Sequence, residues 1–176
     1  MARIRKFCAY RRLERPFTRR SKYKSESFIK ASPPSKIIRF DMGNSKKEFP
    51  LTLSLVSSSP LQIRHNAIES ARQTGNRHLE KFLGKEGFHM KIRIFPHHVL
   101  RENPLAAGAG ADRMSTGMQK AFGKSISVAA QVHTNQTLIT LRIEKNHLAI
   151  GKRALQKAAS KLPCNCRIVQ SGPVTF

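Results

Sequence analysis

The sequence predicts an α+β fold in which a mainly antiparallel sheet carries two helices on one face, with a basic arm before it and a long loop within it. Three observations predict this. Two segments place apolar residues at helical spacing, and several others alternate apolar and polar residues with the period of a strand. The elements follow one another as strand, strand, helix, strands, hairpin, helix, strand, which is not the regular alternation of a doubly wound nucleotide-binding fold.

The first half of the chain predicts two strands and a helix. Alternation predicts strands at residues 36–41 and 51–56. A helix is then expected to begin at Ser59, as an N-cap that forms a capping box with Gln62, and to end at Gly84. The inward face of this helix would hold Leu61, Ile68, Ala71, Gly75, Leu79 and Phe82.

The second half predicts strands, a hairpin and a closing helix. Strands are expected at residues 88–95 and 97–101. Residues 126–132 and 139–143 alternate on either side of turn residues, which predicts a β-hairpin. A helix capped by Asn146 and ended by Pro163, then a strand at 166–169, would complete the fold. The closing helix would bury Leu148, Leu155, Ala158, Ala159 and Leu162.

Positive charge is the strongest feature of the composition. The 176 residues include 33 Lys and Arg against 10 Asp and Glu, a formal net charge of +23. Such a chain repels itself unless a polyanion neutralises it, and nucleic acid phosphates suit this role. A membrane surface is the weaker alternative, because no stretch of about 18 apolar residues occurs. The three cysteines and the lack of a secretory signal indicate a reducing compartment.

The first 35 residues are predicted to be a basic arm and linker, ahead of a single α+β domain at 36–176. Apolar residues are interleaved with the cations of the arm, namely Ile4, Phe7, Tyr10, Leu13, Phe17 and Tyr23. Two interpretations remain open. The arm inserts into RNA and stacks its rings on bases, or it packs those rings on its own domain.

Residues 102–124 form a predicted long loop within the domain, since they contain several glycines and show neither period. The glycines would allow the backbone to approach a phosphate chain closely, and Arg113, Lys120 and Lys124 supply positive charge. The alternative is a flexible insertion without a function.

Three motifs could suggest an enzyme, and each fails on spacing. Residues 107–113 lack the third glycine of a dinucleotide fingerprint and the Gly-Lys-Ser/Thr of a P-loop. Cys164 and Cys166 would point to one face of a strand, but no second metal-binding pair exists, so two unreactive thiols are expected. His97 and His98 lie near Glu102 without a nucleophile, and are interpreted as loop or RNA-contact residues. We therefore expect no catalysis, cofactor or metal.

Several segments, in order, resemble the universal large-subunit ribosomal protein family that includes the eukaryotic QM protein, and in particular its archaeal branch. The resemblance runs from about residue 1 to 170 and rests on collinearity. The segments that carry it are Ala67–Arg72, Gly87–Pro96, His98–Arg101, Gly110–Met118, Ala121–Lys124, Ala154–Pro163 and Arg167–Val169.

The resemblance implies a protein of the large subunit of the cytoplasmic ribosome, with an α/β hammerhead fold and no catalytic role. It would bind large-subunit rRNA at the foot of the central protuberance and help to position A-site and P-site tRNA. Other large-subunit proteins are expected partners, 5S rRNA is a further candidate, and neither a membrane nor a homo-oligomer is expected. In bacterial relatives the loop is richer in Gly and Lys where this chain has Ser115, Thr116 and Met118.

The expected site residues form two groups. The rRNA-binding group is basic and comprises Arg3, Arg5, Lys6, Arg11, Arg12, Arg15, Arg19, Arg20, Lys22, Lys24, Arg64, His65, Arg72, Arg77, Arg93, Arg153, Lys157 and Lys161. The tRNA-proximal group belongs to the loop and its base and comprises Arg101, Gly108, Gly110, Arg113, Met114, Ser115, Lys120 and Lys124. The competing interpretation is a non-ribosomal nucleic-acid-binding protein or RNA chaperone, which charge alone does not exclude.

Overall fold

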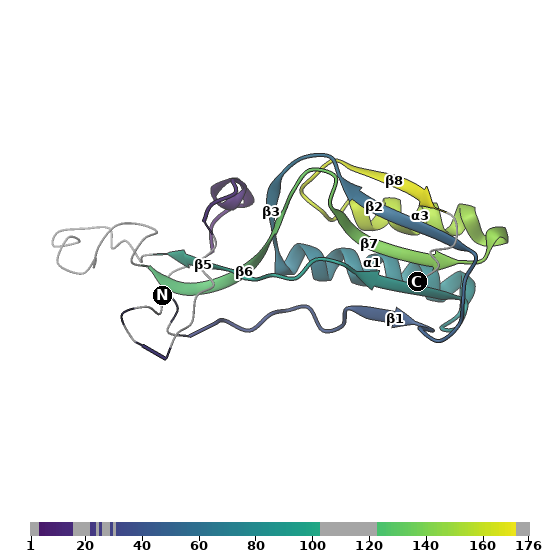
Figure 1. The fold of residues 1–176 in the computed structure, drawn as a ribbon, viewed down its shortest axis with the longest axis horizontal. Coiled ribbons are helices and arrows are strands. Elements are labelled where there is room, and N and C mark those ends of the chain that lie inside the picture. The colour runs from purple at the N-terminus through teal and green to yellow at the C-terminus, as the bar shows by residue number, and fades with distance from the viewer. Residues whose placement is uncertain are drawn as a thin grey trace.

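The described residues of the computed structural model are 4–15, 22–23, 25, 29, 31–102 and 123–171. They form two antiparallel sheets and two α-helices (Figure 1). The five-stranded sheet has the order β1 (Asp41–Gly43), β4 (Phe88–Ile92), β7 (Thr137–Ile143), β2 (Leu51–Ser57) and β8 (Cys166–Ser171). The three-stranded sheet has the order β3 (Leu61–Arg64), β6 (Lys124–Val132) and β5 (His98–Glu102). The helices are α1 (His65–Leu83) and α3 (Leu148–Ala159), and short 3-10 turns lie at Phe7–Tyr10 and Lys145–His147. This confirms the α+β class, with two sheets in place of one.

Two antiparallel segments, residues 51–64 and 124–143, pass from one sheet into the other and bend together between them. Strand β2 pairs with β7, from Leu51 opposite Ile143 to Val56 opposite Thr137. The same two segments then continue as β3 and β6 in the other sheet. At the bend, the Ser57 N–H donates to the Gln136 carbonyl at 3.0 Å, and the Asn135 N–H donates to the Ser57 carbonyl at 2.9 Å.

The predicted hairpin between residues 126–132 and 139–143 is therefore wrong. Strands β6 and β7 lie in different sheets and do not pair with each other. The residues between them, with Asn135 in the left-handed region at φ 63°, bend the chain from one sheet into the next. Two alternating runs separated by turn residues are compatible with a hairpin and equally with a bend from one sheet into another. Which of the two forms depends on the strands with which each run pairs.

The first helix begins later than predicted. Leu61 and Ile63 are buried and lie on β3, opposite Val132 and Ala130, and the helix starts at His65 without a side-chain cap. The capping signature at Ser59 is thus overridden by strand pairing, a tertiary interaction. The predicted stop is confirmed, because Gly84 adopts φ 68° and donates its N–H to the Glu80 carbonyl.

Other boundaries shifted by a few residues. The strand predicted at 36–41 is wrong over most of its length, since only Asp41 belongs to β1. The strand predicted at 88–95 ends at Ile92, whereas those predicted at 51–56, 97–101 and 166–169 correspond to β2, β5 and β8. Asn146 lies in a 3-10 turn and does not cap α3 with its side chain.

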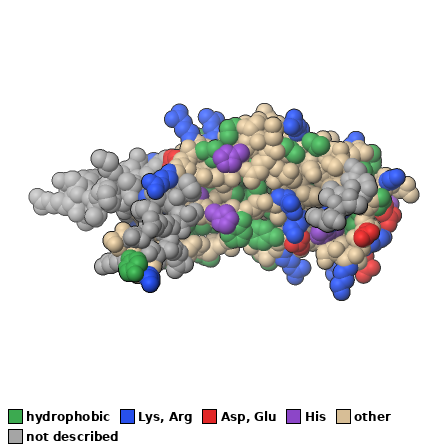
Figure 2. Space-filling view, viewed as in Figure 1, with side chains coloured by type: hydrophobic (Ala, Val, Ile, Leu, Met, Phe, Trp, Pro, Cys, Tyr) green, Lys and Arg blue, Asp and Glu red, His purple; other side chains and the backbone are tan. Residues whose placement is uncertain are grey.

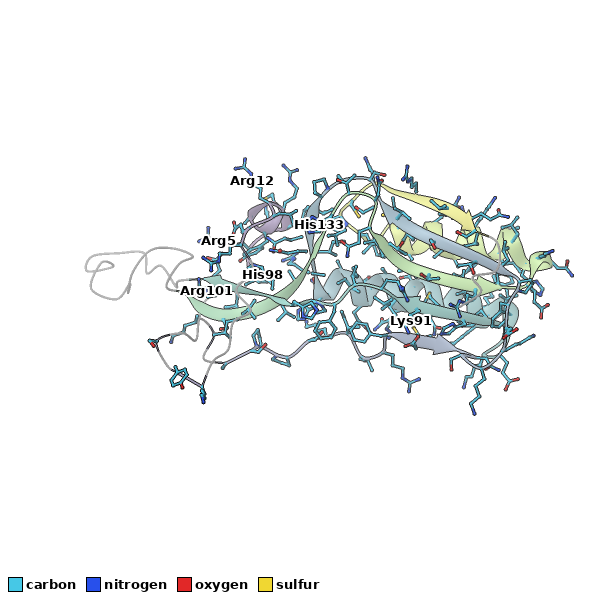
Figure 3. The ribbon with its side chains drawn as sticks, in the orientation of Figure 1. Arg5, Arg12, Lys91, His98, Arg101 and His133 are labelled. Atoms are coloured by element: carbon cyan, nitrogen blue, oxygen red, sulfur yellow. The ribbon has the colours of Figure 1, made fainter. Side chains whose placement is uncertain are left out.

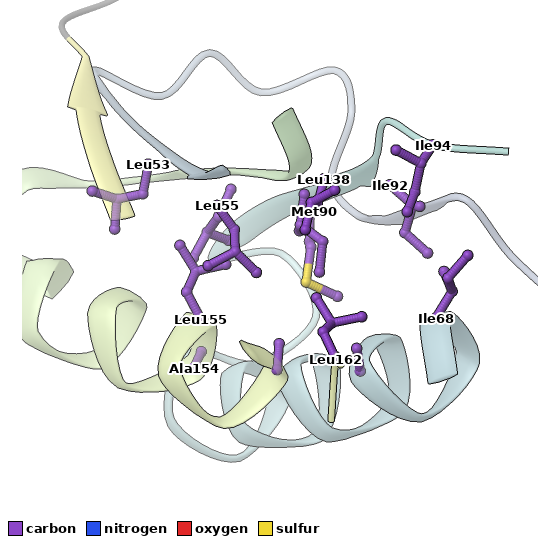
Figure 4. Packing of buried hydrophobic residues seen from close by; sticks show 14 of the residues in the cluster. Leu53, Leu55, Ile68, Met90, Ile92, Ile94, Leu138, Ala154, Leu155 and Leu162 are labelled. Carbon is purple, nitrogen blue, oxygen red and sulfur yellow. The ribbon is translucent and has the colours of Figure 1, made fainter. Parts of the chain in front are cut away.

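Helices α1 and α3 cover one face of the five-stranded sheet, as predicted (Figures 1 and 4). The core between the layers includes Leu53, Leu55, Met90 and Leu155, all 1% exposed or less (Figure 4). The two helices meet at small residues: a Cβ on Gly75 would lie 3.5 Å from the Ala158 Cβ. This close approach brings the outer, basic faces of both helices next to each other.

Candidate nucleic-acid interface

A basic cleft of about 340 Å³ runs between α1 and α3. Its lining consists of Gln73, Thr74, Arg77, His78, Lys81 and Lys157, which includes three cations and no acid. Arg77 and Lys81 are one helical turn apart on α1, and Lys157 comes from α3. The cleft is therefore a feature of tertiary packing, built from cations of two helices far apart in sequence.

The electrostatic character of the cleft shows in His78. The Lys157 Nζ lies 3.0 Å from the His78 Nδ1, so a neutral imidazole accepts a hydrogen bond from the ammonium group. Burial lowers the pKa of His78, and the neighbouring charges of Lys157, Arg153 and Lys81 lower it further. The positive charge around the cleft therefore disfavours protonation of His78, and a bound anion such as a phosphate would reduce the repulsion between these cations.

The N-terminal segment 4–15 is docked on the three-stranded sheet. Tyr10 is only 4% exposed, and its hydroxyl donates to the Glu102 Oε1 at 2.8 Å. The Arg5 guanidinium lies 3.1 Å from the other oxygen of Glu102. Gln62 on β3 donates to the backbone carbonyls of Tyr10 and Arg12. Figure 3 shows Arg5 and Arg12 on this segment, beside Arg101 of β5.

Of the two interpretations of the arm, packing on its own domain therefore holds for residues 4–15, where Phe7 also packs against the main core. The cations Arg11, Arg12 and Arg15 of the same segment are exposed. The fold thus fixes the backbone of this segment and leaves its charges accessible.

Several of the expected rRNA-binding side chains take part in contacts within the protein, and four of them bind groups on the domain or the docked arm. Arg72 donates twice to Glu69, at 2.8 and 2.6 Å, and its side chain is 11% exposed. His65 is buried, where its Nδ1 accepts from the Lys36 N–H and its Nε2 lies 3.2 Å from the Ser127 Oγ. Burial, followed by the charges of Lys36 and Arg64, lowers the pKa of His65. Arg64 donates to the Arg5 carbonyl at 2.9 Å, and Arg5 contacts Glu102 as described above.

The remaining expected residues divide by accessibility. Exposed cations are Lys6, Arg11, Arg12, Arg15, Lys22, Arg77, Arg93, Lys124, Arg153 and Lys161, while Arg101 and Lys157 are half-buried. The face shown in Figure 2 carries Lys and Arg in several places and fewer acids. Outside the described residues lie Arg3, Arg19, Arg20, Lys24, Gly108, Gly110, Arg113, Met114, Ser115 and Lys120.

The structure also places two of the three motifs that could suggest an enzyme, whereas residues 107–113 lie outside the described residues. Glu102 contacts Tyr10 and Arg5, while His98 is buried with a pKa lowered by burial. Cys164 and Cys166 do lie side by side, with their sulfurs 3.3 Å apart. No group of three potential metal ligands occurs among the described residues. Within the same part of the chain, no helix has the length and apolar character needed to cross a bilayer.

The expected site residues do not include His78, Gln62 or Glu102. Lys81 is not among them either, although helical periodicity places it on the same basic helix face as Arg77, four residues earlier. His78 and Lys157 are brought together only by helix packing. Glu102 anchors a segment more than 85 residues away, a contact that no local pattern indicates.

Together, the fold and the cleft define a small basic α+β protein suited to binding a polyanion. The sequence model of the ribosomal protein L16p/L10e family matches residues 14–169. The chain is 43% identical over 152 residues to "Large ribosomal subunit protein uL16" of Methanococcus maripaludis (strain C7), which covers 86% of this chain and 88% of the relative. It is 42% identical over 160 residues to the protein of the same name from Archaeoglobus fulgidus, covering 91% of this chain and 88% of that one.

The chain therefore belongs to the ribosomal protein L16p/L10e family, which confirms the resemblance and its archaeal character. The family consists of structural ribosomal proteins and not of enzymes.

Proposed function

We propose that the chain is a structural protein of the large subunit of the cytoplasmic ribosome and that it binds rRNA phosphates in the cleft between α1 and α3. The observation that carries this proposal is the lining of the cleft, which has three cations and no acid. The relatives bear the name of a large-subunit protein, and the net charge of +23 requires a polyanionic environment.

The geometry of the cleft suits a phosphate backbone. Arg77 and Lys81 are separated by a rise of about 6 Å along α1, so they can contact successive positions of one strand. Lys157 faces them from α3 and holds its ammonium against a neutral His78. Each ammonium or guanidinium that contacts a phosphate releases condensed counterions, which favours binding.

A second basic surface lies on the docked arm, at Arg11, Arg12 and Arg15. Because Gln62 and Glu102 hold this segment on the sheet, these cations are carried by ordered backbone and lose less conformational freedom on binding than a free tail would. In this proposal residues 36–176 form the rRNA-binding domain, and residues 1–35 extend its basic surface.

The loop 102–124 is assigned to tRNA. Its two ends leave adjacent antiparallel strands, with Glu102 of β5 opposite Lys124 of β6, so the sheet gives it a fixed base. We assign to Arg113 a role in accommodating A-site and P-site tRNA. Other large-subunit proteins are the remaining proposed partners, with 5S rRNA as a further candidate.

The ribosomal assignment is tested by sedimentation. A tagged chain expressed in an archaeal host should travel with large subunits through a sucrose gradient and remain there after a moderate salt wash. A chain that leaves the subunits for the top of the gradient, or that travels with DNA, would contradict the assignment.

The loop assignment is tested by Arg113→Ala. We expect normal incorporation into large subunits and slower tRNA accommodation, measured by single-turnover tRNA binding to purified ribosomes. The control is Lys85→Ala, an exposed cation beyond the end of α1, which should leave both readouts unchanged. Unaltered tRNA binding in the Arg113 variant would refute the role of the loop.

A further inference from the structure

Two of the three cysteines are held against each other at the end of the closing helix. The Cys164 and Cys166 sulfurs are 3.3 Å apart, and both residues are half-buried. Cys166 begins β8, an edge strand of the five-stranded sheet, and lies opposite Ser57 of β2. Cys8 is exposed, on the docked arm.

The backbone fixes this arrangement. The Ser58 N–H donates to the Asn165 carbonyl at 2.9 Å, which ties the residue between the two cysteines to the end of β2. On the other side, Leu162 is 9% exposed and anchors the turn in the core. The two thiols therefore meet because of the fold, and a small movement would bring the sulfurs to bonding distance.

The two thiols of the pair also differ in pKa. The two sulfurs share a hydrogen bond in which either thiol can donate. With the Cys166 thiol as donor, this bond stabilises a thiolate on Cys164 and lowers the pKa of Cys164 to about 7, against the opposing effect of burial. A smaller effect of the Ser57 side chain also lowers the pKa of Cys164. The same contact and burial raise the pKa of Cys166. One sulfur is thus a nucleophile near neutral pH, and the other keeps its proton.

We propose that Cys164 and Cys166 form an oxidisable dithiol, a modification site that a hydroperoxide converts into an intramolecular disulfide. This pair lies outside the lining of the cleft between α1 and α3.

The reaction has two balanced steps. The Cys164 thiolate attacks the terminal peroxide oxygen, the O–O bond breaks, and the alkoxide leaves with a proton as an alcohol, or as water from hydrogen peroxide. This oxidises Cys164 to a sulfenic acid. The Cys166 sulfur then attacks the Cys164 sulfur, the S–O bond breaks, and the hydroxide leaves with the Cys166 proton as water. Two thiols and one hydroperoxide give one disulfide, one alcohol and one water.

The test uses the full-length chain with hydrogen peroxide as the probe. In a Cys8→Ser background, which prevents disulfides through Cys8, we expect a product that has lost two hydrogen atoms. Trypsin should release both cysteines in one peptide, residues 162–167, with the disulfide inside it. The rate of its formation from the sulfenic acid should not depend on protein concentration, because the reaction is intramolecular.

Two variants assign the roles. In Cys8→Ser/Cys166→Ser the serine hydroxyl can still donate to the thiolate, and a dimedone-type reagent should capture a sulfenic acid at Cys164. In Cys8→Ser/Cys164→Ser, Cys166 should react at least about threefold more slowly than Cys164, because it is mostly protonated near neutral pH.

The unmodified chain provides a measurement that does not depend on any variant folding, because Cys8 serves as an internal reference. Residues 162–167 should become oxidised before Cys8 does. Preferential oxidation of Cys8, sulfenic acid at Cys166 in place of Cys164, or disulfides only between chains would each overturn the proposal.

Discussion

At the scale of single residues, buried charges hold the start of the domain together. Glu69 on α1 accepts two hydrogen bonds from Arg72, one from Gln73 and one from the Ile38 N–H at 3.4 Å. The bonds from Arg72, more than the others, lower the pKa of Glu69 below its ordinary value of 4.5, although burial opposes them. The cluster joins the helix to the segment that leads into β1, so an acidic residue on the basic helix has a structural role.

Glu69→Gln should destabilise the fold by about 2 kcal/mol at pH 7, because it leaves the Arg72 guanidinium largely buried without its carboxylate. A carboxyl with a lowered folded pKa stabilises the protein above the unfolded value, and this contribution disappears as the pH falls through the folded pKa. The difference in unfolding free energy between the variant and the original chain should therefore shrink below about pH 4.5. Urea unfolding at pH 7 and pH 3 measures it. An equal difference at both pH values, or one no larger than that of the exposed control Glu86→Gln, would contradict this role.

Two glycines with positive φ form a matched pair for a second prediction. Gly43 has φ 85° and a Cβ there would collide with the Phe88 carbonyl oxygen, whereas Gly84 has φ 68° and open space around it. Gly84→Ala should cost about 1–3 kcal/mol, because φ 68° with ψ −176° is a backbone conformation that is essentially restricted to glycine. Gly43→Ala should cost at least about 1–3 kcal/mol more, because the β1–β4 pair must also move apart. Denaturant unfolding measures the loss of unfolding free energy in each variant. Equal losses would contradict the prediction, because the collision at residue 43 would then have no effect on stability.

At the scale of elements, the sequence predicted which segments form helices and strands better than where they begin and what they pair with. The end of the helix at Gly84 was predicted correctly, because the tendency of glycine to end a helix depends on the local sequence alone. The start failed because Leu61 and Ile63 suit a strand as well as a helix, and pairing with β6 decided in favour of the strand. The corner at Asn135 failed for a similar reason: the nearby sequence is the same for a corner and a hairpin.

The docked arm is the element for which the structure adds most. Tyr10→Phe removes the hydrogen bond to the carboxylate of Glu102, a residue that is only 2% exposed. We expect this loss to weaken the docking of residues 4–15 on the sheet. Amide exchange of this segment should become about tenfold faster while that of α1 stays unchanged. Tyr23→Phe, at a residue that is 59% exposed, is the control. If amide exchange of residues 4–15 is equally slow in Tyr10→Phe and Tyr23→Phe, Tyr10 does not anchor the arm.

At the scale of the whole molecule, composition and element order were enough to predict a basic α+β protein that binds nucleic acid, and the family resemblance predicted that this nucleic acid is rRNA. They were not enough to select the interface. Arg72 and His65 belong to the same expected rRNA-binding group as Arg77 and Lys157, yet the first two are largely buried and the second two line the cleft. The difference depends on how α1 and α3 pack against each other and against the sheet, which periodicity within either helix does not contain.

The central claim is that the cations of the α1–α3 cleft contact rRNA phosphates. Its most direct test is the salt dependence of binding to a folded fragment of large-subunit rRNA, for the original chain and for Arg77→Gln/Lys81→Gln/Lys157→Gln. A matched variant, Lys46→Gln/Lys85→Gln/Lys145→Gln, removes the same charge from exposed positions outside the cleft.

Each lost phosphate contact reduces the slope of log affinity against log salt by about 0.7–0.9. We predict that the cleft variant loses about two units of slope and that the matched variant changes by much less. Equal slopes in the two variants, or no change from the original chain in either, would contradict the account.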